Sequence, residues 1–346
     1  MTIIYLYRSL AAFGGVERIF IDKANYLAEH YGYHVYIITW EQGGHSIVYP
    51  LSPKVTHVDW GILFYRQYQY GLFKRMFMQW KMEKEFFKKL SNFVHTTQAD
   101  IVIGASCEFT TMAGMDLLQR KTHTILETHS MRTSIEKNNP PAGNLLMRWA
   151  FKRRDKQLHQ YIKHMSAFVT LTHNDAKDWS DITPQARIIP NMLHRYPAEI
   201  SPDKKTQKRI ITAGRLVEQK GYDLLLDAWS KVHQKHPEWI LDIYGEGEDK
   251  TMLLEKRKNL ALENSVLFHP PTLDIYQKYM DSDFYVMSSR FEGFGLVLAE
   301  AMSCGIPCVS FDCPHGPSDI IKDYEDGLLV EKENIKELAD KICYLI

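Results

Sequence analysis

Short runs of apolar residues alternate along the chain with longer stretches whose apolar positions follow helical spacing. In the first half, this pattern predicts strands at 2–7, 34–39, 55–58, 100–104, 122–126, 167–171 and 187–189, and helices at 16–31, 72–94 and 145–164. In the second half, it predicts strands at 209–213, 240–244, 266–268, 284–288 and 307–311, and helices at 222–236, 250–261, 273–279, 296–303 and from 335 onward. Nearly continuous apolar strands that alternate with helices are typical of parallel sheets covered on both faces.

A polar stretch from His194 to Lys208 interrupts both halves of the pattern and contains two prolines and three lysines. We therefore predict two doubly wound, Rossmann-like α/β domains, at residues 1–197 and 198–346. The last helical pattern reaches the end of the sequence without a capping residue, so we expect a helix that is cut short or followed by a short tail. In such sheets, ligands bind beyond the C-terminal ends of strands and beside helix N-termini.

Charge is distributed unevenly over the 346 residues. The sequence has 42 basic and 42 acidic side chains, so its formal net charge is zero and no nucleic acid partner is expected. Residues 1–200 carry 24 basic and 17 acidic side chains, however, and residues 201–346 carry 18 and 25. This difference suggests two domains with different partners.

The composition excludes several classes of protein. With 45% hydrophobic and 24% charged residues the chain is ordinary globular material, and no apolar run reaches the roughly 18 to 20 residues of a membrane span. The N-terminus enters a strand pattern without the features of a signal peptide, so we expect a cytoplasmic protein. Five cysteines indicate reduced thiols. For Cys304, Cys308 and Cys313, which form no C-x-x-C pair, small buried residues are favoured over a metal site.

Gly14 and Gly15 follow the first predicted strand and open the next predicted helix. Backbone N–H groups at such a turn can approach a phosphate or a sugar closely. The spacing is not G-x-G-x-x-G, which disfavours a nicotinamide-dependent dehydrogenase. A tight turn without a ligand is the alternative.

Arg215 and Lys220 lie on the loop after the first predicted strand of the second half. A guanidinium fork and an ammonium group on one strand-to-helix loop can converge on an anion such as a diphosphate. Two solvated surface cations are the alternative.

Two carboxylates occupy the stretch 288–302, in which a predicted strand leads through a glycine-rich loop into a helix. Glu292 lies on the loop, the helix begins near Gly295, and Glu300 lies on its second turn. Carboxylates accept hydrogen bonds from vicinal hydroxyls, so the pair can bind a sugar and a ribose. Alternatively, Glu292 is a favourable charge at the helix N-terminus and Glu300 faces solvent, although the apolar neighbours of Glu300 favour a pocket.

The spacing of Glu292 and Glu300 resembles the E-x7-E element of the family-four glycosyltransferases, formerly called group one, which have the GT-B fold of two facing Rossmann-like domains. The resemblance covers nearly the whole chain. It also includes Gly14-Gly15 with Glu17, the loop from Gly214 to Gly221, Gly245-Glu246-Gly247 and Gly305-Ile306-Pro307. Together these motifs are specific.

The resemblance implies a role for each matching residue. Arg215 and Lys220 would hold the donor diphosphate. Glu300 would bind the ribose hydroxyls, and Glu292 the transferred sugar. The further donor-binding positions would be Gly14, Gly15, Gly245, Phe294, Gly295 and Leu296. His129 is similar to the family's N-domain histidine near the sugar and the acceptor, the alternative being an ordinary loop histidine.

The resemblance also implies a reaction. Members of this family retain anomeric configuration and need no divalent metal, so no cofactor is expected. The D-x-D at 281–283 precedes a predicted strand instead of ending one, which places it poorly for a metal–diphosphate complex. The expected activity is hexosyl transfer from a UDP-linked rather than a GDP-linked sugar to a glycan or polyprenyl-diphosphate-linked glycan in cell-surface polysaccharide assembly. A GT-B sugar-nucleotide epimerase or phosphorylase is the alternative, and a binding module without activity is disfavoured because the charged residues are present.

Residues 64–89 combine basic and aromatic side chains. This composition suits peripheral contact with an anionic membrane, for which the loop 65–71 and the stretch 148–156 with five basic residues are the better candidates. The protein would then lie at the inner face of the cell membrane. Alternatively, the apolar side chains of this segment pack on the sheet, because they follow helical spacing. They are Phe73, Met76, Phe77, Trp80, Phe87 and Leu90.

Overall fold

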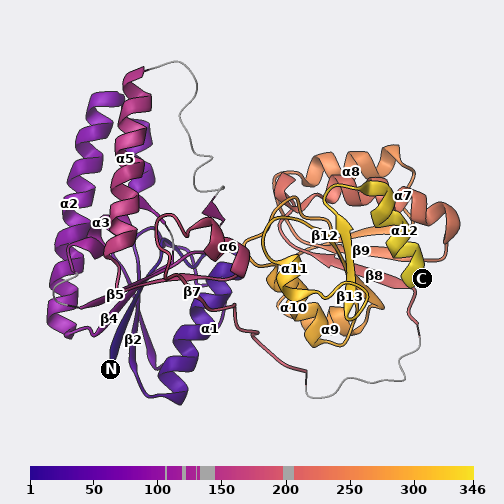
Figure 1. Cartoon of the computed structure of the whole chain (residues 1–346), viewed down its shortest axis with the longest axis horizontal. Coiled ribbons are helices and arrows are strands. Elements are labelled where there is room, and N and C mark those ends of the chain that lie inside the picture. The colour runs from indigo at the N-terminus through magenta and orange to yellow at the C-terminus, as the bar shows by residue number, and fades with distance from the viewer. Residues whose placement is uncertain (106, 119–121, 130, 133–144, 198–205) are drawn as a thin grey trace. The chain divides into compact units, whose positions relative to one another are not determined.

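The computed structural model describes the chain except residues 106, 119–121, 130, 133–144 and 198–205, and it describes the helix over 145–151 without its side chains. Two compact units are present, Met1–Met192 and Leu193–Ile346 (Figure 1). Part of the predicted linker, residues 198–205, lies outside the described residues. No helix in the described part of the chain is long and apolar enough to cross a membrane.

The first unit contains a seven-stranded parallel sheet in the order β3-β2-β1-β4-β5-β6-β7. Its strands are β1 (Thr2–Leu6), β2 (His34–Thr39), β3 (Val55–Asp59), β4 (Ile101–Gly104), β5 (His123–Glu127), β6 (Ala167–Thr170) and β7 (Arg187–Ile188). Its helices are α1 (Gly15–His30), the 3-10 helix η1 (Phe64–Gln69), α2 (Leu72–Thr97), α3 (Phe109–Asp116), α5 (Leu145–His164) and α6 (His173–Asp178). The direction of strand addition reverses beside β1, so β1 and β4 flank the switch point of this sheet.

The second unit contains a six-stranded parallel sheet in the order β10-β9-β8-β11-β12-β13. Its strands are β8 (Arg209–Ala213), β9 (Ile240–Tyr244), β10 (Val266–His269), β11 (Phe284–Met287), β12 (Cys308–Asp312) and β13 (Gly327–Glu331). Its helices are the 3-10 helix η2 (Glu218–Lys220), α7 (Tyr222–Lys235), α8 (Lys250–Asn259), α9 (Ile275–Met280), α10 (Leu296–Ser303), α11 (Pro317–Ile320) and α12 (Ile335–Leu345). Here β8 and β11 flank the switch point.

The predicted strands and helices are confirmed to within a few residues at their ends. Five of them, β2, β8, β9, α5 and α10, have the predicted bounds. The pattern missed α3, α6, α11 and β13, which are four to eight residues long. Elements this short carry too few periodic positions to be distinguished from loops.

Apolar clusters cover both faces of each sheet, as the continuous apolar strands predict. In β1, Ile4 and Leu6 belong to one cluster and Ile3 and Tyr5 to the other, because successive side chains of a strand point to opposite faces. The cysteines at positions 304, 308 and 313 are 2%, 0% and 1% exposed, and none of the five cysteines, all of which are described, forms a disulfide. The prediction of small buried thiols is confirmed for these three.

The first turns of α2 do not pack on the sheet. Phe73, Met76, Phe77 and Trp80 are 87%, 62%, 60% and 56% exposed. The buried residues of this helix are Met82, Phe86, Leu90 and Val94. The interpretation that the apolar side chains of this segment pack on the sheet is therefore wrong for Phe73, Met76, Phe77 and Trp80. Helical spacing indicates an apolar face but not a neighbour that covers it.

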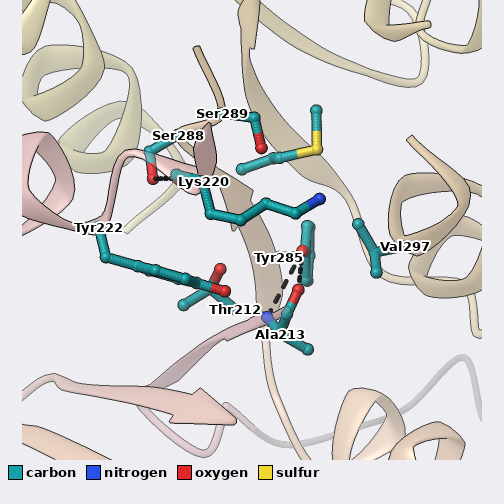
Figure 2. A pocket seen from close by; sticks show the side chains of 9 residues that line it. Thr212, Ala213, Lys220, Tyr222, Tyr285, Ser288, Ser289 and Val297 are labelled. Carbon is teal, nitrogen blue, oxygen red and sulfur yellow. Dashed lines mark hydrogen bonds between the residues drawn. The ribbon is translucent and has the colours of Figure 1, made fainter. Parts of the chain in front are cut away.

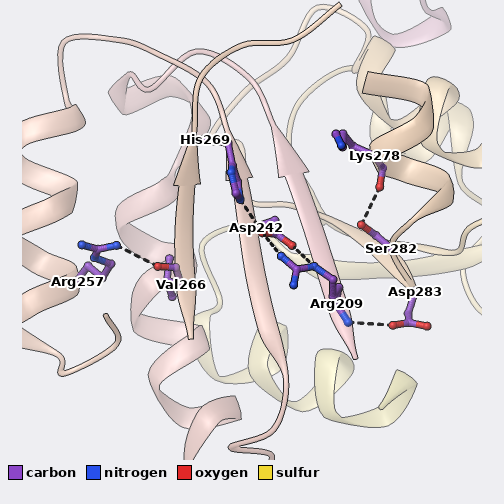
Figure 3. Close-up of polar contacts among 8 residues, drawn as sticks. All are labelled: Arg209, Asp242, Arg257, Val266, His269, Lys278, Ser282 and Asp283. Carbon is purple, nitrogen blue, oxygen red and sulfur yellow. Dashed lines mark hydrogen bonds and ion pairs between the residues drawn. The ribbon is translucent and has the colours of Figure 1, made fainter. Parts of the chain in front are cut away.

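A polar network connects three strands of the second sheet (Figure 3). The carboxylate of Asp242 on β9 is 2% exposed and accepts two hydrogen bonds from the Arg209 guanidinium on β8, at 2.6 and 2.8 Å. His269 Nε2 on β10 lies 2.7 Å from the same carboxylate. The Asp283 carboxylate accepts a hydrogen bond from the backbone N–H of Arg209 at 2.9 Å. Asp283 belongs to the D-x-D and precedes β11, as predicted. Because its carboxylate binds the backbone of Arg209, it stabilises the beginning of β8.

Candidate active site

The loops that follow β8 and β11 lie together because these two strands are paired in parallel. Their carboxyl ends therefore reach the same edge of the sheet. The backbone N–H of Arg290 donates a hydrogen bond to the carbonyl oxygen of Gln219 at 2.8 Å. The hydroxyl of Ser288 donates to the carbonyl oxygen of Lys220 at 3.0 Å. These bonds join two segments that are far apart in the sequence.

Lys220 and Glu292 form a buried ion pair between the two loops. Nζ of Lys220 lies 2.6 Å from Oε1 of Glu292, and the two side chains are 16% and 8% exposed. The hydroxyl of Ser289 donates to the same carboxylate oxygen at 2.6 Å. Two of the predicted site residues are thus in direct contact, and each buried charge has an opposite charge beside it.

Lys220 also lines a pocket next to this ion pair (Figure 2). The other lining residues are Thr212, Ala213, Tyr222, Tyr285, Met287, Ser288, Ser289 and Val297. Burial raises the pKa of both tyrosine hydroxyls well above the ordinary range, so both groups are neutral near pH 7. The Tyr285 hydroxyl donates to the carbonyl oxygen of Ala213 at 3.2 Å. The pocket therefore surrounds one ammonium group with neutral hydroxyls.

Glu300 is buried, with 5% of its surface exposed, which excludes the solvent-facing alternative. The hydroxyl of Tyr279 lies 3.5 Å from Oε2 of Glu300. The helix that carries Glu300 begins at Leu296, directly after Gly295, whose φ of +84° is a left-handed conformation that favours glycine. Phe294 and Gly295 are buried and Leu296 is half-buried. The loop can therefore turn sharply into α10, the helix that carries Glu300.

Gly245 packs closely against the loop that carries Arg215 and Lys220. A Cβ at Gly245 would lie 2.0 Å from the carbonyl oxygen of Gly214. The exposed Arg215 is on that loop, and among the described residues its guanidinium has no ion-pair partner. Only glycine fits at position 245, because a larger side chain would collide with the backbone of Gly214. Of the two predicted cations, Lys220 pairs with Glu292 and Arg215 does not.

Gly14 and Gly15 lie where β1 passes into α1. Gly14 is the N-cap and Gly15 the first residue of the helix. The side chain of Glu17 folds back over the turn, because a Cβ at Gly14 would lie 2.0 Å from Oε2 of Glu17. The hydroxyl of Tyr7 donates to the other carboxylate oxygen at 3.0 Å. The turn at the end of β1 is confirmed, and its contact with a phosphate stays a prediction.

His129 lies two residues after the end of β5, and its side chain is 3% exposed. Its ring packs edge-on against Phe20, and its Nε2 lies 3.3 Å from Oε2 of Glu127. Nζ of Lys23, on α1, lies 2.8 Å from the same oxygen. Burial raises the pKa of Glu127, but the hydrogen bond to His129 and the charge of Lys23 outweigh burial and lower that pKa to about 2. His129 is therefore a buried, hydrogen-bonded side chain, and its role near the sugar and the acceptor stays a prediction.

The structure adds residues that the sequence did not single out. Ser289 and Glu127 lie close in sequence to predicted site residues, so their places at strand ends were the available signal. Lys23 pairs with Glu127 across 104 positions, and Tyr222 opens α7 on the far side of the loop. No local pattern indicates the pairing of Lys23, whereas Tyr222 lies two residues after Lys220 and had the same signal as Ser289.

Comparisons with known proteins show which sequences and folds the chain is similar to. Residues 198–346 match the family described as glycosyl transferases group 1. An uncharacterized glycosyltransferase of Haemophilus influenzae is 29% identical over 352 residues, which cover 99% of this chain and 89% of that protein. A poly(ribitol-phosphate) alpha-N-acetylglucosaminyltransferase of Staphylococcus aureus is 31% identical over 201 residues, which cover 57% of this chain and 40% of that enzyme.

A solved structure resembles the chain over nearly its whole length. Staphylococcus aureus TarM, as a point mutant in complex with fondaparinux, alpha-GlcNAc-glycerol and UDP, aligns with a TM-score of 0.75 and 17% sequence identity. The alignment covers 99% of this chain and 92% of TarM. The predicted GT-B fold of two Rossmann-like domains is therefore confirmed.

Proposed function

We propose that the chain, whose residues 198–346 match the group 1 glycosyl transferases, transfers a hexosyl group, with retention of configuration, from a UDP-linked donor to a glycan or lipid-linked glycan. It is a glycosyltransferase with a nucleotide-sugar donor. The observation that carries the finer proposal is the contact of Lys220 with the buried Glu292 at the switch point of the second sheet, in a unit that also buries Glu300.

The diphosphate of the donor gains negative charge as its bond to the sugar breaks. Lys220 supplies an ammonium group and Arg215 a guanidinium on the same loop, and the N-terminus of α10 adds a favourable dipole. When the donor binds, Lys220 exchanges Glu292 for the phosphate, and Glu292 becomes free to accept hydrogen bonds from the sugar. Because these groups supply the positive charge that a divalent metal supplies elsewhere, we propose that transfer needs no metal ion.

Glu300 is the proposed ribose ligand. A buried carboxylate can accept hydrogen bonds from both hydroxyls of a vicinal diol, and few competing waters reach it. Uridine as the base is supported by TarM, which was crystallised with UDP.

In the proposed step, the acceptor oxygen forms a bond to the anomeric carbon on the face from which the diphosphate departs. The bond between that carbon and the diphosphate oxygen breaks, its electron pair stays on the phosphate, and the acceptor proton passes to a departing phosphate oxygen. Attack and departure on one face retain the configuration. Since no protein nucleophile is needed, Glu292 positions the sugar instead of attacking it.

The acceptor is proposed to be a phosphate-bearing polymer or lipid-linked glycan of cell-surface assembly. Support comes from the Staphylococcus aureus relative, whose name gives poly(ribitol-phosphate) as its acceptor. The excess of basic over acidic side chains in residues 1–200 suits such an anion. His129, in the first unit, is proposed to lie near the acceptor hydroxyl.

The experiment incubates the protein with UDP-GlcNAc, UDP-glucose or UDP-galactose and with poly(ribitol-phosphate) or polyprenyl-diphosphate-linked glycans. We expect UDP release that depends on the acceptor, and NMR of the product should show an α-linkage formed from the α-linked donor. Lys220→Ala and Glu300→Ala should each lower kcat/KM by about 100-fold or more, as loss of a transition-state contact does. The control Glu325→Ala, at a 73% exposed side chain, should match wild type.

Two results would contradict the proposal. Wild-type turnover in either site variant would remove the residue assignments. Hydrolysis or epimerisation of a UDP-sugar without any acceptor would favour a GT-B epimerase or phosphorylase instead.

We also propose that α2 contacts an anionic membrane from the cytoplasmic side, where a lipid-linked acceptor is held. The apolar side chains at its start, Leu72, Phe73, Met76, Phe77 and Trp80, are 56–87% exposed. Exposed basic side chains accompany them at Arg66, Lys74, Lys81 and Lys84. Aromatic and basic groups on one exposed helix match the interfacial and anionic layers of a bilayer. The side chains of the other predicted contact, residues 148–151 within 148–156, lie outside the described residues.

A further inference from the structure

We propose that Glu127 is a positioning residue, which fixes the tautomer of His129 so that the Nδ1 atom of the imidazole is left as a hydrogen-bond acceptor for substrate. This inference rests on the proposed function for the role of His129 in transfer. The tautomer itself is a property of the unliganded protein.

Three side chains converge where β5 ends. Glu127 is the last residue of that strand, and its side chain is 9% exposed. Lys23 Nζ lies 2.8 Å from Oε2 of Glu127, and His129 Nε2 lies 3.3 Å from the same oxygen. The side chains of Lys23 and His129 are 16% and 3% exposed. One buried carboxylate oxygen thus faces one cation and one imidazole nitrogen.

An ionised carboxylate only accepts hydrogen bonds, so its chemistry decides which ring nitrogen carries the proton. The pKa of Glu127 is lowered to about 2, and the group is therefore ionised throughout the range in which the protein works. Nε2 of His129 must then carry a hydrogen to bond with Oε2. In the neutral ring, the lone pair is left on Nδ1.

Nδ1 of His129 is buried and has no hydrogen-bond partner among the described residues. A buried acceptor without a partner has lost the hydrogen bond that it makes with water in the unfolded chain, so this atom is held at a cost in stability. Such an atom suits a hydroxyl group that arrives with the substrate and donates to it after a local side-chain shift. We assign that hydroxyl to the sugar or to the acceptor, the groups that the proposed reaction brings to His129.

The test uses protein with ¹⁵N-labelled histidine and long-range ¹H–¹⁵N NMR, which distinguishes protonated from unprotonated ring nitrogens. Fifteen histidines are present, so the signals of His129 are identified by their loss in His129→Gln. In wild type we expect Nε2–H and an unprotonated Nδ1. In Glu127→Gln, where the amide can donate to Nε2, we expect the Nδ1–H tautomer to grow at the expense of Nε2–H.

The control Glu85→Gln, at a 49% exposed side chain, should leave the spectrum of His129 unchanged. Because wild type is measured first, the proposal is testable even if Glu127→Gln folds poorly. A wild-type His129 with its proton on Nδ1, or an unchanged tautomer in folded Glu127→Gln, would overturn it.

Transfer assays give a second measurement. Glu127→Gln should lower kcat by about 10- to 100-fold, as loss of an orienting partner of histidine does elsewhere, with little change in the KM for the donor. If the tautomer shifts but wild type transfers no sugar, the proposed function fails and the positioning role stands. If wild type transfers sugar and Glu127→Gln matches it, the positioning role is wrong.

Discussion

Asp175 lies in the first turn of α6 and is 3% exposed. Burial raises the pKa of its carboxyl group to about 7, against about 4 in an unfolded chain. Its backbone N–H donates to the Thr172 hydroxyl at 3.1 Å, which fixes the residue at the helix start. A carboxyl group with a raised native pKa is protonated in the folded protein at pH values where the unfolded chain has already lost that proton.

The sign of the pH dependence follows. Stability from protonated Asp175 is fully present below about pH 4 and is lost as the pH rises towards about 7. Between pH 5 and pH 8, the free energy of unfolding of wild type should therefore fall by on the order of 2 kcal/mol more than that of Asp175→Asn, which cannot ionise. Urea unfolding at both pH values measures this, with the exposed Asp312→Asn as control. Equal pH dependence in wild type and Asp175→Asn would contradict it.

For single residues, the sequence indicates a candidate site residue where a predicted strand ends and a charged or small residue follows. Lys220 and Glu292 were predicted in this way, and they are in contact. Glu300 was predicted from its apolar neighbours on a helix and from its spacing to Glu292. The pairing of Lys23 with Glu127 could not be predicted, because it depends on how a helix and a strand 104 positions apart are packed.

The apolar spacing of α2 predicts the helix but not which of its apolar side chains are buried. Its apolar spacing continues through Phe73 and Trp80, but burial begins only at Met82. Periodicity predicts the helix and its apolar face, whereas the partner of that face depends on the tertiary structure or on another surface.

The proposed membrane contact is tested at this helix. Wild type should float with vesicles that contain anionic phosphatidylglycerol at low salt and less at high salt, because exposed basic groups add attraction that salt screens. Phe73→Ser combined with Phe77→Ser should stay unbound. Leu273→Ser, which removes a 55% exposed side chain from the second unit, is the matched control. Wild type that fails to float at low salt would remove the proposal.

The positions of the strands could be predicted from the sequence, but their order in each sheet could not. The alternation of strands and helices predicts two parallel sheets, and β8 and β9 have the predicted bounds. The order β10-β9-β8-β11-β12-β13 depends on crossovers that periodicity does not record. That order makes β8 and β11 neighbours and so brings Lys220 to Glu292.

For the whole molecule, a net charge of zero conceals two unlike halves. The first 200 residues carry the basic excess, and the rest of the chain, which carries the proposed donor site, is acidic in total. The proposed site nevertheless contains Lys220, with the exposed Arg215 on the same loop, so we expect local charge and not the total to determine what it can bind.

The most direct test of the account is nucleotide binding, measured by calorimetry and by thermal unfolding with UDP, UDP-GlcNAc, UDP-glucose, GDP and ADP. At 100 times the Kd, a nucleotide adds about 2.7 kcal/mol to stability. We predict that UDP and a UDP-sugar bind and stabilise wild type and Glu325→Gln, that GDP and ADP do so far less, and that Lys220→Ala and Glu300→Gln each weaken UDP binding at least about tenfold. If no uridine nucleotide binds wild type, or if both site variants bind UDP as wild type does, the proposed donor site is wrong.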